Sequence, residues 1–190
     1  MRYADGVERL NQLEVLAEAA GLTLFYGDES HVCQQGYVPY GWQFPGEDVF
    51  VPAQKGFRLN CRGLFSRDNR CHWATTSAHS TAAFVRDRLE ALSLQLPGPM
   101  VIVLDNASVH TAGIIQQCRA VWERRGLYLF FLPPYSPHLN IAETVWRHLK
   151  GGWLRPTDYA RPDDLAYATN RCLANFGKAL TITFSPFKIN

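Results

Sequence analysis

Apolar runs and amphipathic segments alternate along this chain. Residues 7–20 carry apolar side chains at steps of three and four positions, which predicts an amphipathic helix that ends at Gly21. Residues 22–27 form a short apolar run of β-forming residues and predict the first strand. Further short strands are predicted at 48–53, 57–65 and 71–76.

The second half of the chain alternates helices with apolar strands. Residues 79–96 predict a helix that Ser80 can cap. Residues 100–104 are apolar without alternation, which is typical of a strand buried on both faces. The remaining predicted elements are a helix at 109–125, a strand at 127–132, a helix at 138–150 that Gly151 and Gly152 stop, and a helix at 162–176.

This order of elements predicts the fold class. Early antiparallel strands followed by β-α-β-α units indicate one α/β domain, a mixed sheet flanked by helices on both faces. The chain has 190 residues, of which 47% are apolar and 19% are charged, as expected for a globular domain and not for a disordered one.

Charge and cysteine content narrow the class of protein. The net charge of +2 is weak evidence for a nucleic-acid partner, although arginines cluster locally. The five cysteines occur singly, which argues against a disulfide framework and a structural zinc site. No apolar run approaches a membrane-spanning length and no signal peptide is evident, so we expect a cytoplasmic protein without a membrane partner.

Three acidic residues follow or lie beside these predicted elements. Asp28 and Asp105 each come at the end of an apolar strand, and Glu143 lies in the helix after the strand at 127–132. Binding sites of open α/β sheets gather at the carboxyl ends of strands, and carboxylates are the ligands that hard divalent cations prefer. The pattern therefore predicts a divalent-metal site suited to phosphodiester chemistry.

Each acidic residue also has a purely structural interpretation, and these alternatives stay open. Asp28 can be a solvated strand end, and Asp105 can form an Asx turn that leads into the next helix. Asn140 and Glu143 have the spacing of a capping box.

Three sequence blocks carry a family resemblance. They are GDES at 27–30, LDNASVH at 104–110 and LPPYSPHLNIAETVW at 132–146. The blocks resemble the signatures of DDE transposases, and most closely those of the IS630 family in the IS630/Tc1/mariner superfamily. The third block is the most specific of the three. The resemblance covers roughly residues 22–176.

The resemblance implies a fold, a metal site and a reaction. It implies an RNase H-like fold in which Asp28, Asp105 and Glu143 bind two Mg²⁺ or Mn²⁺ ions. The implied reaction is DNA cleavage followed by transfer of the freed 3′ hydroxyl to target DNA. His138 and Ile141 depart from the family pattern, which commonly has an acidic residue and a proline there, but neither is a presumed ligand.

The same resemblance shapes the expected domain organisation. We expect an N-terminal helix at 1–20 as a linker remnant, a catalytic domain at 21–178 and a tail at 179–190. The helix-turn-helix domains usual in the family do not fit in 20 residues, so a separate chain is a candidate for DNA recognition. A homodimer and a prokaryotic cytoplasm follow by analogy only.

Further side chains are candidates for supporting the metal ligands or for contacting DNA. Asn106 could orient Asp105, and His110 could support the site or contact a phosphate. Arg147 and Lys150 could follow a DNA backbone along the helix that carries Glu143. The alternatives are a helix cap, a histidine satisfied by the backbone and a solvated helix face. The full set of candidates is Asn106, His110, Asn140, Arg147 and Lys150.

Other residues and functions complete the expectations. Residues 36–47 predict a turn or hairpin tip whose Tyr37, Tyr40 and Trp42 could stack on bases or simply pack together. Glu29 and Asp48 are treated as acidic bystanders of the metal site. The alternative functions are a stand-alone RNase H-like nuclease and an inactive transposase remnant that binds DNA or a partner chain.

Overall fold

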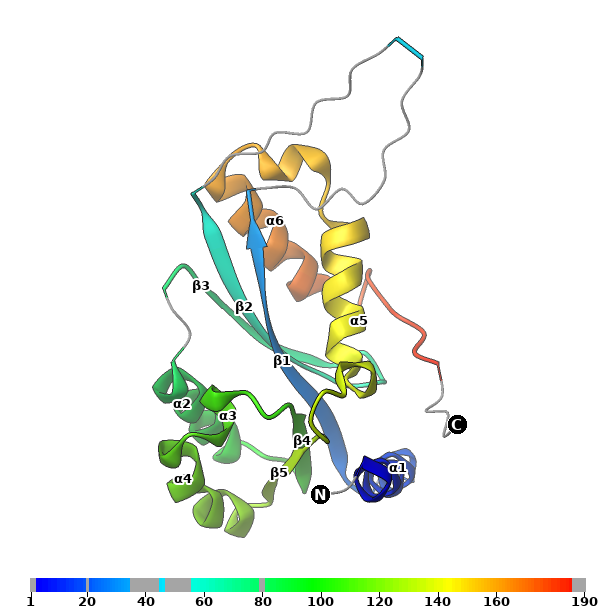
Figure 1. The fold of residues 1–190 in the computed structure, drawn as a ribbon, viewed down its shortest axis with the longest axis vertical. Coiled ribbons are helices and arrows are strands. Elements are labelled where there is room, and N and C mark those ends of the chain that lie inside the picture. Colours follow the sequence, from blue (N-terminus) through cyan, green and yellow to red (C-terminus); the bar gives the residue numbers. More distant parts are fainter. Residues whose placement is uncertain (1–2, 20, 35–44, 47–55, 79–80, 186–190) are drawn as a thin grey trace.

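The computed structural model of the protein describes residues 3–19, 21–34, 45–46, 56–78 and 81–185 (Figure 1). Several predictions lie outside the described residues. They are the strand at 48–53, the helix cap Ser80 and nearly all of the turn at 36–47, with its Tyr37, Tyr40 and Trp42. No helix of the described part is long and apolar enough to cross a membrane.

The described strands form one mixed sheet of five strands in the order β3-β2-β1-β4-β5. The first three strands pair antiparallel, and β4 and β5 add to β1 in parallel. This arrangement confirms the predicted α/β class. The strands are β1 (Thr23–Cys33), β2 (Arg58–Phe65), β3 (Cys71–Thr76), β4 (Met100–Leu104) and β5 (Leu127–Phe131).

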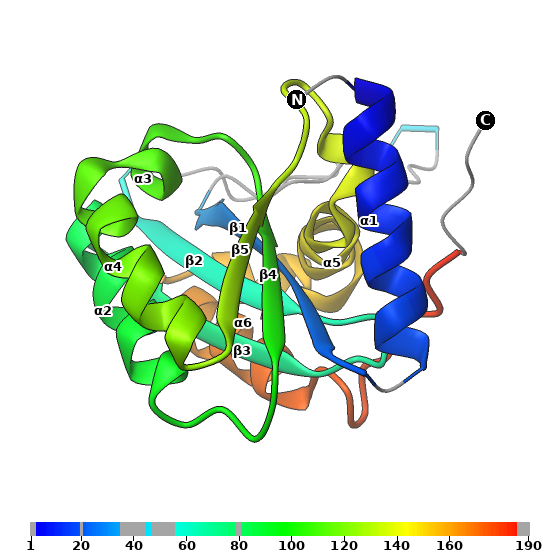
Figure 2. The ribbon, with the colours of Figure 1, turned by 90° about the horizontal axis from the view of Figure 1, so that it is seen from below.

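Helices cover both faces of the sheet (Figure 2). Along β1, Phe25 packs with one apolar cluster while its neighbours Leu24 and Tyr26 pack with another, because successive strand side chains point to opposite faces. The face of Phe25 is covered by α2 (Ala82–Ser93), α3 (Ser108–Thr111) and α4 (Gly113–Arg124), and the other face by α1 (Tyr3–Glu18), α5 (Ile141–His148) and α6 (Pro162–Asn175).

The first strand is longer than predicted. Its apolar run stops near Gly27, but β1 continues to Cys33 because it stays paired with β2 over that length. Asp28 therefore lies within β1, opposite Gly63, and the prediction that it ends the strand is wrong.

Several predicted helices differ from the structure in their ends or continuity. The helix predicted at 7–20 is α1, which begins four residues earlier, at Tyr3, and ends at Glu18. Thr81 caps α2, since its hydroxyl accepts a hydrogen bond from the Phe84 backbone. The helix predicted at 109–125 is broken at Ala112, whose ψ of 147° is extended. The helix predicted at 138–150 begins as a 3₁₀ turn, Pro137–Leu139. Its α-helical part ends at His148, and Gly151 and Gly152 do not stop it but lie within the π-helical turn Leu149–Trp153 that continues it.

Candidate functional site

The three predicted carboxylates face one cavity. β1 and β4 are parallel, and Tyr26 is paired with Val103. Asp28 and Asp105 each come two residues after this pair, so they occupy matching positions of the two segments. Glu143 approaches from the first turn of α5, a helix that contacts β1. All three side chains line a cavity of about 430 Å³. The topology thus brings together residues that are far apart in the sequence.

The loop after β5 forms the opposite wall of this cavity. It contains Pro133, Pro134 and Pro137, and between them Tyr135 has a positive φ of 56° and is fully exposed. Prolines limit the conformations open to the loop, so the wall is stiff at this point. The complete lining is Asp28, Asp105, Asn106, Ala107, Leu132, Pro133, Pro134, Tyr135, Ser136, Pro137, Asn140 and Glu143.

Electrostatic repulsion acts on the carboxylate of Asp28. Burial, together with the negative charges of Glu143, Asp105 and Glu29, raises the pKa of Asp28 to about 7, against a hydrogen bond from the Glu29 backbone that lowers it. Among the described residues, no lysine, arginine or histidine forms an ion pair with Asp28 or Glu143. The cavity therefore has an excess of negative charge.

The donor chemistry of the cavity fits a divalent cation. Carboxylate oxygens are the preferred ligands of Mg²⁺ and Mn²⁺, and a cation would relieve the repulsion that raises the pKa of Asp28. In the described part of the chain, no three acidic, histidine or cysteine side chains stand together as a ready metal site. Binding would therefore require Asp28 and Glu143 to rotate towards Asp105 within the shared cavity.

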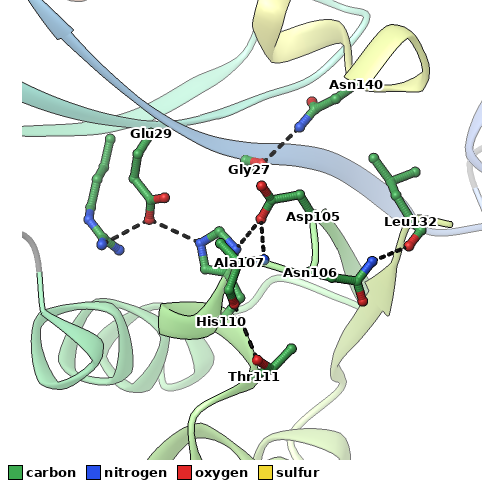
Figure 3. Close-up of polar contacts among 10 residues, drawn as sticks. Gly27, Glu29, Asp105, Asn106, Ala107, His110, Thr111, Leu132 and Asn140 are labelled. Carbon is green, nitrogen blue, oxygen red and sulfur yellow. Dashed lines mark hydrogen bonds and ion pairs between the residues drawn. The ribbon is translucent and has the colours of Figure 1, made fainter. Parts of the chain in front are cut away.

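Asp105 is held from one side by His110 (Figure 3). The Asp105 Oδ1 atom lies 2.7 Å from Nδ1 of His110 and accepts a hydrogen bond of 3.0 Å from the Ala107 backbone. The hydrogen bond to His110 is the main reason why the pKa of Asp105 is lowered. His110 therefore supports Asp105, as one of its two predicted roles required.

His110 also contacts Glu29. Its Nε2 atom lies 3.0 Å from Oε1 of Glu29, which in turn forms an ion pair of 2.8 Å with Arg62. Burial alone lowers the pKa of His110, but the hydrogen bonds to Asp105 and Glu29 outweigh it and raise the pKa to about 9. Both ring nitrogens thus donate hydrogen bonds, each to a carboxylate.

Two asparagines connect the segments around the cavity. Asn106 does not orient Asp105, because its amide donates to the Leu132 carbonyl at 2.5 Å. It is not a helix cap either, because the residue before α3 is Ala107. Both interpretations of Asn106 are therefore wrong. Asn140 caps α5 by accepting from the Ala142 backbone at 3.0 Å, and it donates to the Gly27 carbonyl at 3.1 Å (Figure 3).

The capping box predicted for Asn140 and Glu143 is only half formed. The cap on the Asn140 side is present, but the Asn140 backbone N–H donates to the Pro137 carbonyl at 2.8 Å. That bond occupies the donor that Glu143 would have needed. The Glu143 side chain instead lines the cavity.

The two basic candidates that follow the third block, Arg147 and Lys150, do not line the cavity. Arg147 is exposed one turn beyond Glu143 and donates to Thr144. Lys150 lies in the π-helical turn, where its charge contributes, after burial and Arg58, to the lowered pKa of His31. A DNA contact by either residue stays a prediction.

The residue that sequence reasoning missed is Glu29. From the sequence alone, it is expected only to be an acidic bystander of the metal site. Successive side chains of a strand point to opposite faces, so the neighbour of Asp28 reaches the α3 side of the sheet, where His110 lies. The alternation of side chains along a strand could therefore have indicated that Glu29 lies on the opposite face from Asp28.

Comparison with known proteins identifies the family. The family model described as DDE superfamily endonuclease matches residues 23–166. The chain belongs to this family. An uncharacterized protein of Sinorhizobium fredii, y4pE/y4sA, is 30% identical over 89 residues, which are 47% of this chain and 57% of that protein. The chain thus spans little more than half the length of this curated relative.

Solved structures show the same fold in this DDE superfamily endonuclease. The Mos1 strand transfer complex has a TM-score of 0.51 at 16% identity, with 94% of this chain and 63% of that chain covered. The simian T-cell lymphotropic virus intasome has a TM-score of 0.56 at 15% identity, with 80% and 47% covered. The expected RNase H-like fold of transposase and integrase cores is confirmed.

Proposed function

We propose that this domain cleaves DNA strands and joins the freed 3′ ends to target DNA, as a transposase of the IS630 family. The observation that carries the proposal is the shared cavity of Asp28, Asp105 and Glu143, in which three carboxylates from separate sequence blocks accumulate negative charge. Family membership supports endonuclease chemistry, and the Mos1 complex, a fold relative, was solved in a strand-transfer state.

The proposed reaction consists of two in-line displacements at phosphorus. In cleavage, a water oxygen forms a bond to phosphorus while the bond from phosphorus to the 3′ oxygen breaks, and that oxygen leaves as a hydroxyl. In joining, this 3′ hydroxyl attacks a target phosphate and displaces the target's own 3′ oxygen. No bond to the protein forms in either step.

The chain's own residues would bind and orient the metal ligands. Asp28 and Asp105 would present their oxygens from neighbouring strands, and Glu143 from the helix beside them. Two bound Mg²⁺ or Mn²⁺ ions would activate the attacking hydroxyl and stabilise the leaving oxygen. The stiff loop around Tyr135 would exclude water from one side and contact the DNA.

The partners are part of the same proposal. Two DNA ends must reach one target, so we propose that two copies of the chain act together. The family match is to an endonuclease and covers residues 23–166, which include the carboxylate cavity. We therefore propose that a separate chain or region recognises the ends of the element.

A plasmid assay tests the activity. The chain would be incubated with Mn²⁺, a supercoiled plasmid and a short duplex that carries a labelled, free 3′ hydroxyl. We expect nicked plasmid together with label joined to plasmid, and loss of both products in Asp105→Ala. Glu123→Gln, an exposed carboxylate on α4, is the matched control and should behave as the native chain.

The alternative functions give different outcomes in the same experiments. Nicking without joined label would indicate a stand-alone nuclease. Mn²⁺ binding by calorimetry then separates an enzyme from an inactive remnant. Equal heats for the native chain and Asp105→Ala would contradict the metal site and favour a remnant that only binds DNA or a partner.

A further inference from the structure

The hydrogen bonds around His110 join residues that are 81 positions apart in the chain. Glu29 belongs to β1 and Asp105 follows β4, and the imidazole on α3 spans the gap between them. The His110 side chain is only 3% exposed, while that of Asp105 is 50% exposed. The hydrogen bonds from Glu29 through His110 to Asp105, here called the bridge, therefore have a buried centre and a solvent-facing end at the cavity.

The Glu29 end of the bridge is anchored on the sheet. Glu29 and Arg62 are paired residues of the antiparallel strands β1 and β2, and their ion pair of 2.8 Å spans neighbouring strands. The Glu29 side chain is 26% exposed. Because its carboxylate contacts both Arg62 and His110, it can rotate less freely than a solvated glutamate.

The bridge stands between two cavities. Glu29, Arg62 and His110 line a cavity of about 470 Å³ beside α2, whereas Asp105 lines the carboxylate cavity of about 430 Å³. Asp28 lines both. The imidazole thus forms part of the wall behind Asp105, on the side away from the loop that follows β5.

The contacts of Asp105 are divided between its two oxygens. Oδ1 accepts from the His110 ring and from the Ala107 backbone. Among the described residues, no donor hydrogen-bonds to the other oxygen, and Figure 3 shows it on the side of β1. An imidazole held at one nitrogen by a carboxylate has a fixed ring orientation, and so has the ligand bonded to its other nitrogen.

We propose that Glu29 is a positioning residue that, through His110, fixes the Asp105 carboxylate so that its second oxygen faces the cavity shared with Asp28 and Glu143. The inference rests on the proposed function, because it assumes that Asp105 binds a metal ion. It assigns to Glu29 no contact with metal or DNA. Glu29 affects only the orientation of Asp105, the proposed metal ligand.

The experiment measures Mn²⁺ affinity by counting free Mn²⁺ from its electron paramagnetic resonance signal. Glu29→Ala removes the acceptor of His110 Nε2 and should weaken Mn²⁺ binding about 10-fold. Glu29→Gln keeps an acceptor oxygen at the same distance and should stay within about threefold of the native chain. Glu123→Ala on α4 is the matched surface control.

A double-mutant cycle shows whether Glu29 acts through the imidazole. In a His110→Ala background, Glu29→Ala should change the Mn²⁺ affinity by less than about twofold, because the connection is already lost. The NMR signal of the His110 Nε2 proton gives a readout without metal. It should be visible in the native chain and in Glu29→Gln, and absent in Glu29→Ala.

The possible results separate this inference from the proposed function. If Asp105→Ala abolishes Mn²⁺ binding while Glu29→Ala binds as the native chain does, the positioning role is overturned and the proposed function stands. If Asp105→Ala binds Mn²⁺ like the native chain, both are overturned. Should Glu29→Ala not fold, Glu29→Asp, which keeps the charge but withdraws it from Nε2, takes its place with the same expected loss.

Discussion

Two groups of side chains with buried or partly buried carboxylates lie along the same strand, β1, and they differ in how the negative charge is compensated. Near the start of the strand, Glu14 of α1 is buried and bonded both to the Tyr26 hydroxyl and to Arg67, whose Nε lies 2.7 Å away. Two residues later, Asp28 shares a cavity with Glu143, and among the described residues neither forms an ion pair. The first cluster is neutralised within the protein, and the second is not.

We propose that this difference separates a structural carboxylate, Glu14, from a carboxylate that binds a metal ion, Asp28. A buried charge is stable only when it is paired, and Glu14 has its arginine. Asp28 lacks such a partner, and burial together with neighbouring carboxylates raises its pKa to about 7. Charge that the fold leaves uncompensated supports the proposal that a cation binds at this cavity.

The largest expected effect comes from removing a carboxylate that lines the cavity shared with Asp28 and Glu143. Asp105→Asn should lower DNA cleavage by about 1,000-fold or more, because a metal ligand is lost while the shape is kept. Thermal stability should change little, since Asp105 is half exposed. Cleavage rates and melting curves measured on the same preparations check both halves. An active Asp105→Asn variant would place the chemistry elsewhere.

Breaking the compensated cluster should have the opposite profile. Arg67→Met leaves the Glu14 charge buried without its ion-pair partner, and should lower the free energy of unfolding by about 3 kcal/mol. Mn²⁺ affinity should be unchanged. Denaturant titration gives the stability. The matched control is Arg70→Met, whose ion pair with Asp68 is exposed and should be worth less than about 1 kcal/mol.

The pH dependence of stability tests the charge of Asp28 in the metal-free protein. Since its pKa is about 7 in the folded state and 3.8 ordinarily, the unfolded chain loses this proton first as the pH rises. The native fold should therefore lose stability between about pH 4 and pH 7. The loss should be on the order of 2 kcal/mol, about half of what the full shift in pKa implies, because Asp28 is partly exposed and solvent screens its charge. Asp28→Asn should lack this loss and be the more stable protein at pH 8.

Unfolding curves at pH 4 and pH 8 measure this effect for both proteins. At pH 4 the two should differ by less than about 1 kcal/mol, because Asp28 carries its proton in the folded state and is only about half ionised in the unfolded chain, where its pKa is 3.8. Asn at the same position keeps the size of the side chain, so packing is matched. A native chain that is equally or more stable than Asp28→Asn at pH 8 would show that the charge of Asp28 is already compensated.

Local patterns predicted the parts of the site that depend on neighbouring residues. The apolar strand before Asp105 and the cap at Asn140 are confirmed, because each is set by a few adjacent positions. The bond between Glu29 and His110 was not predictable in this way, since it depends on strand pairing across 81 positions. The length of β1 was missed for the same reason: its polar end is held by β2 and not by burial.

The smallest expected effect concerns a hydrogen bond between the segments that follow β4 and β5 beside the cavity. Asn106→Ala removes the hydrogen bond to the Leu132 carbonyl, which joins the segments after β4 and β5, and should lower the free energy of unfolding by about 1 kcal/mol. Mn²⁺ affinity should stay within about twofold, because the amide of Asn106 bonds to Leu132 and not to Asp105. Denaturant and Mn²⁺ titrations of one preparation measure both.

Asn175→Ala is the matched control for this change, because the amide of Asn175 bonds only to a carbonyl of its own helix, that of Arg171. It should leave both quantities near those of the native chain. A tenfold loss of Mn²⁺ affinity in Asn106→Ala would mean that Asn106 orients Asp105 after all. It would then be wrong that the neutral hydrogen bonds around the cavity affect stability alone while its charged residues determine metal binding.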